Sequence, residues 1–356
     1  MNKLLQKMLD AGSVTGASIM SESVYFTEKD MVASELPILN IAFSGEVNGG
    51  FTPGLTVISG ESKTFKSMIS LYCLKAYLDK YKDAIGILYD TEYGITLDSL
   101  RALGIDPSRI LHVPVEHIEQ LKFDFVKKLD EIKRGDKVFF LVDSIGQISS
   151  KKETDDAADE KSVADMTRAK SLRSLLRLIT LQLVKKDLPC FMVNHVYMEI
   201  GAMFAKTVIP GGTAVTYSAN TVFVITKSQE KDGTELTGWN FNIGIHKSRF
   251  VKEKSRLPIR VMYEEGIKKY SGILDLALES GEVIKPSNGW FQLVDKETGE
   301  LIGQKTRAKD TETEAFLGVV LKRASFQEWI KNKFKLGAMQ GLHDVEEELA
   351  EEALED

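Results

Sequence analysis

The chain has 356 residues, of which 43% are apolar and 28% are charged, and its formal net charge is −6. This length and composition indicate a globular protein that can hold one large domain and one smaller domain. The negative charge argues mildly against non-specific nucleic-acid binding, although charges of both signs are segregated along the chain.

The two cysteines, Cys73 and Cys190, lie far apart within apolar segments. This pattern favours buried thiols in a reducing compartment over a disulfide framework, and it indicates no metal cluster. The N-terminal segment lacks the apolar stretch of a signal peptide, and no apolar run is long enough to cross a bilayer. We therefore expect a cytoplasmic protein with no membrane partner.

The N-terminal region predicts a short helix followed by an extended arm. Leu4, Leu5, Met8 and Leu9 have helical spacing, and a stretch rich in glycine, serine and threonine follows them. Residues 24–26 (Val-Tyr-Phe) then form a β-prone run between polar flanks. Such a run can pair with the sheet of another subunit or pack within its own chain, and both interpretations stay open here.

Residues 54–67, GLTVISGESKTFKS, predict a buried strand that turns at Gly60 into a helix beginning near Lys66. Except at one position, the loop between them matches the pattern Gly-x-x-x-x-Gly-Lys-[Ser/Thr], in which backbone N–H groups and a helix N-terminus face a phosphate. Phe65 stands at the second glycine of that pattern, a position that favours positive φ. The alternative is a plain strand-to-helix turn without a ligand. The predicted nucleotide-binding residues of the loop are Gly60, Glu61, Ser62, Lys63, Thr64, Phe65, Lys66 and Ser67.

Three further apolar strands alternate with helices, at residues 85–89, 138–142 and 189–193. Continuous apolar strands indicate a mostly parallel sheet with helices on both faces. Right-handed crossovers place the carboxyl ends of such strands at one edge, where ligands bind. A polar run follows each strand: Asp90-Thr91-Glu92, Asp143-Ser144 and Asn194-His195.

Carboxylates at that edge are suited to phosphoryl chemistry. Asp143 can support Mg²⁺ through water, beside the hydroxyl of Ser67. Glu92 can orient and deprotonate a water that attacks a γ-phosphate, whereas a solvated cap on the next helix is the alternative. His195 can sense the γ-phosphate, although a lone histidine is more often structural.

The pattern changes after residue 240. Alternating apolar residues at 241–245 and 259–263 predict half-exposed antiparallel strands that extend the sheet. Lys247-Ser248-Arg249 follows the first of these strands and forms either a solvated face or cationic fingers for a phosphate held by a neighbouring subunit. The tail from residue 344 has no basic residue, which predicts a solvated segment or one that competes with DNA for basic loops.

Two polar loops, residues 149–162 and 198–217, carry side chains suited to single-stranded DNA. Basic groups contact phosphates, and an exposed aromatic ring stacks on bases. Plain flexible loops are the alternative. The predicted DNA-binding residues are Lys151, Lys152, Lys161, Arg168, Met203, Phe204, Lys206, Gly211 and Gly212.

The ordered set of motifs resembles that of the RecA-type strand-exchange recombinases, particularly the UvsX-type recombinases of T4-like phages. The likeness covers about residues 24–336, and the phage branch shares the departure at Phe65. It rests on the phosphate loop, the three polar strand ends, Met203-Phe204, Gly211-Gly212, Lys247-x-Arg249, Tyr263-x-x-Gly266-Ile267, Ser149-Lys-Lys-Glu-Thr, Asp165-Met-Thr-Arg-Ala-Lys and Val251-Lys-Glu-Lys-Ser.

The resemblance implies an α/β fold, a RecA-like P-loop ATPase core. A mostly parallel central sheet would carry helices on both faces, an antiparallel strand extension and a small C-terminal region. The implied segments are an N-terminal helix and arm for subunit contact (1–35), the ATPase and DNA-binding core (36–272), a small C-terminal domain (273–336) and an acidic tail (337–356).

The resemblance also implies a function: an ATP-dependent helical filament on single-stranded DNA that pairs with homologous duplex DNA and exchanges strands. ATP and Mg²⁺ are the implied cofactors. Other implied partners are a phage recombination mediator and a single-strand-binding protein in the host bacterial cytoplasm.

The family roles fall on matching positions of this sequence. Lys66 and Ser67 would bind phosphate and Mg²⁺, Asp143 would support the metal and Glu92 would be the general base. His195 stands where bacterial members carry glutamine, and Ser99 stands where relatives often stack a tyrosine on adenine. The residues implied to act on ATP of the adjacent protomer, or to bind nucleotide outside the loop, are Lys247, Arg249 and Tyr263.

Two other functions remain as alternatives. A ring-shaped helicase motor with the same ATPase fold would form closed hexamers and unwind duplexes. A non-catalytic protein would use ATP only as a structural ligand, and the presence of Glu92, Asp143 and the Lys247/Arg249 pair argues against it.

Overall fold

The computed structural model describes residues 2–14, 16–25, 30–158, 166–198 and 207–337. The chain divides into two compact units, one made of residues 1–35 and 51–226 and the other of residues 36–50 and 227–356. Residues 36–50 therefore group with the C-terminal part of the chain, although the sequence predicts a single core from 36 to 272.

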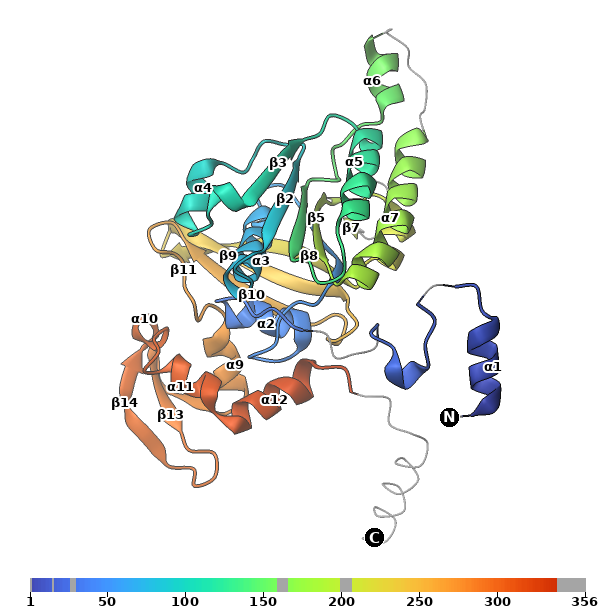
Figure 1. The fold of residues 1–356 in the computed structure, drawn as a ribbon. Coiled ribbons are helices and arrows are strands. Elements are labelled where there is room, and N and C mark those ends of the chain that lie inside the picture. The colour runs from blue at the N-terminus through green and yellow to red at the C-terminus, as the bar shows by residue number, and fades with distance from the viewer. Residues whose placement is uncertain (1, 15, 26–29, 159–165, 199–206, 338–356) are drawn as a thin grey trace. The chain divides into compact units, whose positions relative to one another are not determined.

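The first unit is built on a parallel sheet with the strand order β8-β1-β5-β4-β2-β3 (Figure 1). Every neighbouring pair whose register is defined is parallel. The three inner strands β1, β5 and β4 are buried over nearly their whole length, as their continuous apolar sequences predict. The strands are β1 (Gly54–Gly60), β2 (Ile85–Asp90), β3 (Ile110–Pro114), β4 (Val138–Asp143), β5 (Pro189–His195) and β8 (Thr221–Asp232).

Helices cover both faces of this sheet. On one face α5 (Ile118–Glu131) and α7 (Thr167–Lys186) pack against the inner strands, and Phe125 stacks between Tyr89 and Phe140 at ring distances of 5.2 Å and 4.4 Å. On the other face α3 (Lys66–Lys80) brings Tyr77 to within 5.7 Å of the ring of Phe139. The remaining elements are α1 (Lys3–Ala11), α4 (Leu97–Ala102), α6 (Lys151–Ala158), α8 (Gly212–Ser218), the 3-10 turns Met20–Glu22 and Pro107–Arg109, and the short strands β6 (Tyr197–Met198) and β7 (Thr207–Val208).

The second unit holds the antiparallel strands, in the order β9-β10-β11 after the last part of β8. A three-stranded antiparallel sheet, β12-β13-β14, follows, together with short helices. The elements are α2 (Pro37–Ser44), β9 (Glu235–Lys247), β10 (Arg256–Met262), β11 (Gly266–Ile267), α9 (Ile273–Glu279), β12 (Val283–Ser287), β13 (Trp290–Val294), β14 (Leu301–Arg307), α10 (Ala308–Thr311), α11 (Leu317–Lys322) and α12 (Ala324–Phe334).

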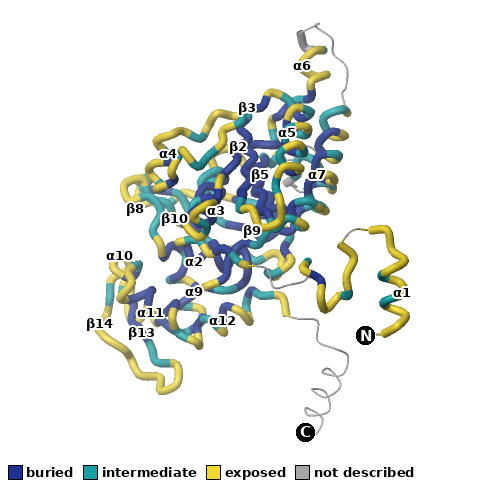
Figure 2. The backbone as a smooth tube through the Cα atoms, in the orientation of Figure 1, coloured by how far each residue is buried: buried dark blue, intermediate teal, exposed yellow. Residues whose placement is uncertain are grey.

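The predicted fold class is confirmed, and so are the buried free thiols of Cys73 and Cys190, whose burial raises the pKa of both groups. Several elements lack a counterpart among the predicted ones, and two of them have a clear physical reason. Strand β3 is an edge strand with a mostly exposed sequence, and α6 lies in a segment that lacks apolar periodicity, so Figure 2 shows it largely exposed. None of the helices in the described ranges has the length and apolar character of a bilayer-spanning segment.

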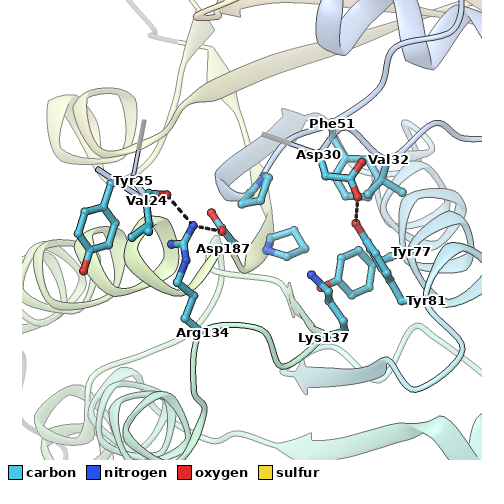
Figure 3. Close-up of a pocket in the computed structure, with 12 residues that line it drawn as sticks. Val24, Tyr25, Asp30, Val32, Phe51, Tyr77, Tyr81, Arg134, Lys137 and Asp187 are labelled. Carbon is cyan, nitrogen blue, oxygen red and sulfur yellow. Dashed lines mark hydrogen bonds and ion pairs between the residues drawn. The ribbon is translucent and has the colours of Figure 1, made fainter. Parts of the chain in front are cut away.

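The N-terminal arm packs against its own unit at the amino ends of the strands. Arg134 donates to the carbonyl oxygen of Val24 at 3.0 Å and lies over the ring of Tyr25, while Tyr81 donates to Asp30 at 2.5 Å (Figure 3). A cavity of about 140 Å³ lies among these residues. Helix α1 has no buried residue, so its role in subunit contact stays a prediction.

The aromatic stack of α5 gives a test of the core. Phe125 is fully buried and Phe123, on the same helix, is 60% exposed. We expect Phe125→Ala to lower the free energy of unfolding by about 3–5 kcal/mol because it removes buried contacts and leaves a cavity. Phe123→Ala is the matched control and should change it by less than about 0.5 kcal/mol. Urea unfolding measures both, and equal effects of the two substitutions would contradict the packing.

Candidate nucleotide-binding and catalytic site

The loop between β1 and α3 has the backbone that a phosphate-binding loop requires. Lys63 and Phe65 have φ of 58° and 65°, so Phe65 adopts the left-handed conformation at the position where the pattern has glycine. This conformation costs a non-glycine residue about 1–2 kcal/mol. Gly60 must be glycine, because an added Cβ would lie 2.6 Å from Thr64 Oγ1 and 2.7 Å from the carbonyl oxygen of Ile225.

Lys66 begins α3 and is 5% exposed. Its Nζ donates to the carbonyl oxygen of Glu61 at 2.6 Å and to Thr64 Oγ1 at 3.4 Å. The ammonium group therefore lies inside the loop, at the N-terminal end of a helix. Both the ammonium charge and the helix dipole attract an anion to this place.

Asp143 ends β4 beside this loop and is buried. Ser67 donates a hydrogen bond to its carboxylate, but Oδ1 has no partner among the described residues. Burial, together with the negative charges of Glu92 and Asp90, raises the pKa of Asp143 to about 6, against the opposing effects of Ser67 and Lys66. A buried carboxylate oxygen without a donor, next to a serine hydroxyl, fits a Mg²⁺ that takes its other ligands from phosphate and water.

Glu92 is held in place by its neighbours at the same edge. Asp90 Oδ1 accepts the backbone N–H groups of Glu92 at 3.1 Å and Tyr93 at 2.7 Å, which fixes the turn after β2. On the side chain, Ser144 Oγ donates to Glu92 Oε1, and His195 Nε2 lies 2.8 Å from the same oxygen.

These contacts shift the pKa of the Glu92 carboxyl group. Burial acts to raise the pKa of its carboxyl group, but the hydrogen bonds from Ser144 and His195 and the positive charge of Lys66 lower it by more. The net pKa lies below the ordinary value, so the carboxylate is ionised at neutral pH. An ionised carboxylate is what a general base requires.

Asn194, the residue before His195 in β5, connects this edge to the second predicted DNA loop. Its Nδ2 donates to the carbonyl oxygen of Pro210 at 2.9 Å, and its Oδ1 accepts the N–H of His195 at 3.0 Å. Gly211 and Gly212 follow with φ of 88° and 58°, where glycine removes the strain.

The comparisons with known proteins agree with this geometry. The family model of the RecA N-terminal domain matches residues 17–268, and the model described as the C-terminal domain of the bacteriophage T4 recombination and repair protein matches residues 270–330. The chain is 46% identical over 355 residues to the "Recombination and repair protein" of Enterobacteria phage T4, covering 99% of this chain and 90% of the relative.

The chain belongs to the RecA family of recombinases.

More distant relatives carry the family name itself. "Protein RecA" of Malacoplasma penetrans is 27% identical over 247 residues, which are 68% of this chain and 72% of that protein. "Protein RecA" of Corynebacterium urealyticum is 27% identical over 283 residues, which are 78% of this chain and 73% of that protein. The chain is thus a recombination protein of the RecA family, in which nucleotide and DNA binding are expected properties.

The residues predicted to bind DNA in this RecA-family chain lie in different environments. Lys151 and Lys152 open α6 and are exposed. Arg168 is half-buried, and its guanidinium donates to backbone carbonyl groups inside the protein. Four of the residues predicted to bind DNA lie outside the described residues: Lys161, Met203, Phe204 and Lys206. Most of the acidic tail also lies outside them.

Lys247, Arg249 and Tyr263 belong to the second unit, whereas the phosphate loop belongs to the first. Burial and the positive charge of Arg249 lower the pKa of Lys247, against the effect of Glu253. Tyr263 is exposed, and its hydroxyl oxygen accepts a hydrogen bond from Trp239 Nε1 at 2.9 Å.

Sequence reasoning assigned no role to Asp90, Thr91 or Ser144, which hold Glu92 and its turn. The sequence signal that could have indicated these residues is their position at the polar ends of predicted strands. Ser99 forms a capping box with Thr96 at the start of α4, which gives it a local structural role.

The burial of Asp143 makes a prediction about stability. Its pKa is raised on folding, so ionisation costs stability as the pH rises from about 4 through about 6, and at neutral pH the full cost is present. We expect Asp143→Asn to raise the free energy of unfolding of the nucleotide-free protein by about 1–3 kcal/mol at neutral pH, with the gain vanishing toward acid pH.

We also expect Mg²⁺ and ATP to stabilise the wild-type protein and not the Asp143→Asn protein. Thermal unfolding over a pH series, with and without Mg²⁺ and ATP, measures both effects. Asp83→Asn, at an exposed position, is the control and should follow the wild type. A less stable Asp143→Asn protein at neutral pH would contradict the assignment.

Proposed function

We propose that this chain is a DNA-dependent ATPase that forms a helical filament on single-stranded DNA, pairs it with homologous duplex DNA and exchanges strands. The observation that carries the proposal is the convergence of Lys66, Ser67, Asp143 and Glu92 at the carboxyl edge of one parallel sheet. The relationship to the T4 recombination and repair protein agrees with it.

The phosphate loop would hold ATP. Backbone N–H groups of residues 60–67 would face the phosphates, and Lys66 would exchange its contacts with Glu61 and Thr64 for phosphate oxygens. Ser67 and Asp143 would hold Mg²⁺, directly or through water. When bound, Mg²⁺ supplies charge neutralisation on the β- and γ-phosphates.

Glu92 would be the general base. Its ionised carboxylate would orient the attacking water and take its proton as the water oxygen bonds to the γ-phosphorus. The bond from that phosphorus to the β–γ bridging oxygen would break, and ADP would be the leaving group. Ser144 and His195 fix this carboxylate through Oε1 and keep its pKa low. An imidazole can carry a positive charge and a serine hydroxyl cannot, so His195 is better suited than Ser144 to sense the γ-phosphate of ATP.

Lys247 and Arg249 would act on ATP bound by the adjacent protomer. The two cations lie close enough that the charge of Arg249 lowers the pKa of Lys247, and a phosphate anion between them would relieve this repulsion. Hydrolysis would then depend on assembly. Tyr263 would contact the nucleotide, and DNA would bind at Lys151, Lys152, Gly211 and Gly212 together with the predicted residues outside the described ranges.

The proposal includes two protein partners. A recombination mediator and a single-strand-binding protein would act with the filament on both single-stranded and double-stranded DNA, in the cytoplasm of the host cell.

Substitution of Lys66 tests the proposal. We expect Lys66→Ala to lower ATP turnover in the presence of single-stranded DNA by about 100-fold or more, because transition-state charge on the transferred phosphoryl group loses its ammonium partner. Lys82→Ala, at an exposed lysine just after α3, is the matched control and should leave turnover unchanged.

Full DNA-stimulated turnover by Lys66→Ala would refute the proposal. Electron microscopy of the wild-type protein with ATP and single-stranded DNA separates it from the helicase alternative, because a recombinase gives open helical filaments and a helicase gives closed hexameric rings.

A further inference from the structure

Residues 144–151 connect the end of β4 with the start of α6, and we name them the connecting segment. At one end Ser144 donates from Oγ to Glu92 Oε1, and Thr91 Oγ1 lies 2.9 Å from both the N–H and the carbonyl oxygen of Ser144. At the other end Lys151 begins the exposed helix α6, which carries the first predicted DNA contacts (Figure 1). A short stretch of chain thus joins the catalytic carboxylate to a DNA-binding helix.

Arg168, in the first turn of α7, holds the near part of the connecting segment. Its Nε donates to the carbonyl oxygen of Ile148 at 2.6 Å, and its Nη2 donates to those of Ile145 at 3.0 Å and Gly146 at 2.8 Å. A planar guanidinium presents several N–H groups in a fixed fork, so it can bridge three carbonyl groups where an ammonium cannot. These three hydrogen bonds direct the guanidinium of Arg168 toward the connecting segment.

Glu119, on α5, holds the far part. Its Oε2 accepts the backbone N–H of Lys151 at 3.0 Å, and its Oε1 accepts the hydroxyl of Ser171 on α7 at 3.0 Å. Burial acts to raise the pKa of Glu119, but these hydrogen bonds, together with those from its own backbone N–H and from His117, lower it by more, so the carboxylate is ionised. Next to it, the N–H of Ile118 donates to the carbonyl oxygen of Ser149 at 2.9 Å.

The middle of the segment packs against the end of β5. Ile145 and Ile148 are buried, and the N–H of Ile145 donates to the carbonyl oxygen of Val193 at 2.9 Å. Gly146 lies so close to His195 that an added Cβ would come within 2.6 Å of its Cδ2. A movement of the segment must therefore displace both contacts of Glu92 Oε1, Ser144 and His195.

We propose that Arg168 and Glu119 are positioning residues that make the connecting segment rigid, so that DNA bound at α6 adjusts Glu92 through Ser144 and His195. The inference rests on the proposed function, because it presumes hydrolysis that DNA stimulates. Close-packed interiors shift between discrete arrangements more readily than they deform continuously, so a segment held at both ends transmits a displacement. Loosening either end uncouples DNA binding from hydrolysis while the DNA contacts remain.

Two substitutions of Arg168 separate this role from a direct phosphate contact. Arg168→Lys keeps the charge and loses the three-carbonyl bridge, and Arg168→Gln loses both. We expect both variants to lower kcat in the presence of single-stranded DNA by about tenfold or more, with the DNA affinity changed by less than about threefold and the slope of log affinity against log salt unchanged. Arg173→Gln, at an exposed arginine of α7, is the matched control and should match the wild type.

A phosphate contact gives a different result. In that case Arg168→Gln would weaken DNA binding and reduce the salt slope by about 1, while Arg168→Lys would largely restore both. That pattern would overturn the proposal. Unchanged kcat and affinity in both variants would overturn it as well.

Glu119→Gln tests the other end and serves if the Arg168 variants fold poorly. Glutamine keeps one carbonyl acceptor, and its amide group cannot accept the second donor. We expect the same loss of DNA-stimulated kcat with retained DNA affinity.

Backbone hydrogen exchange of residues 144–151 gives a readout independent of ATP turnover. Exchange should be about tenfold faster or more in the DNA-free variants than in the wild type if the side chains rigidify the segment. Faster exchange with normal DNA stimulation would overturn the coupling, whereas absence of DNA stimulation in the wild-type protein would overturn the proposed function itself.

Discussion

The buried carboxylate of Asp143 is the constraint on which the site depends. Taking a carboxylate out of water costs free energy unless a cation or donors compensate, and here Ser67 supplies one donor while Oδ1 has none among the residues that the structure describes. Parallel strands bring this carboxylate next to the phosphate loop, and a metal-bound nucleotide in the proposed site would remove the resulting cost. Lys66, Ser67 and the turn at Glu92 are arranged around it.

The arrangement would let one edge of the sheet bind a nucleotide and also transmit its presence to the predicted DNA loops. Glu92 is bound through one oxygen by Ser144 and His195, and each of these groups lies on a segment that leads to a predicted DNA loop. Ser144 begins the connecting segment toward α6, and Asn194, next to His195, is bonded to Pro210 before the Gly211-Gly212 turn. The proposed catalytic base is therefore physically attached to the elements that would meet DNA.

The sequence predicts the sheet and most of the candidate site, because the carboxyl ends of parallel strands meet at one edge of the sheet. The positions of Asp143, Glu92 and His195 follow from apolar runs that end in polar residues. Other features depend on tertiary context: Phe65 has a φ of 65°, which its residue type does not predict, and β3 is a mostly exposed edge strand. The sequence predicts that Arg168 contacts DNA, and it cannot show that the guanidinium donates hydrogen bonds to three backbone carbonyl groups.

The central claim is that this phosphate loop hydrolyses ATP only when the cations of a neighbour complete it. An equimolar mixture of two inactive variants, Lys66→Ala and the double variant Lys247→Ala with Arg249→Ala, tests it most directly in the presence of single-stranded DNA. Random neighbours in a head-to-tail filament pair an intact loop with an intact cation pair at one interface in four, so the mixture should recover about a quarter of wild-type turnover. No recovery above the sum of the separate variants, or full activity of the double variant alone, would contradict the account.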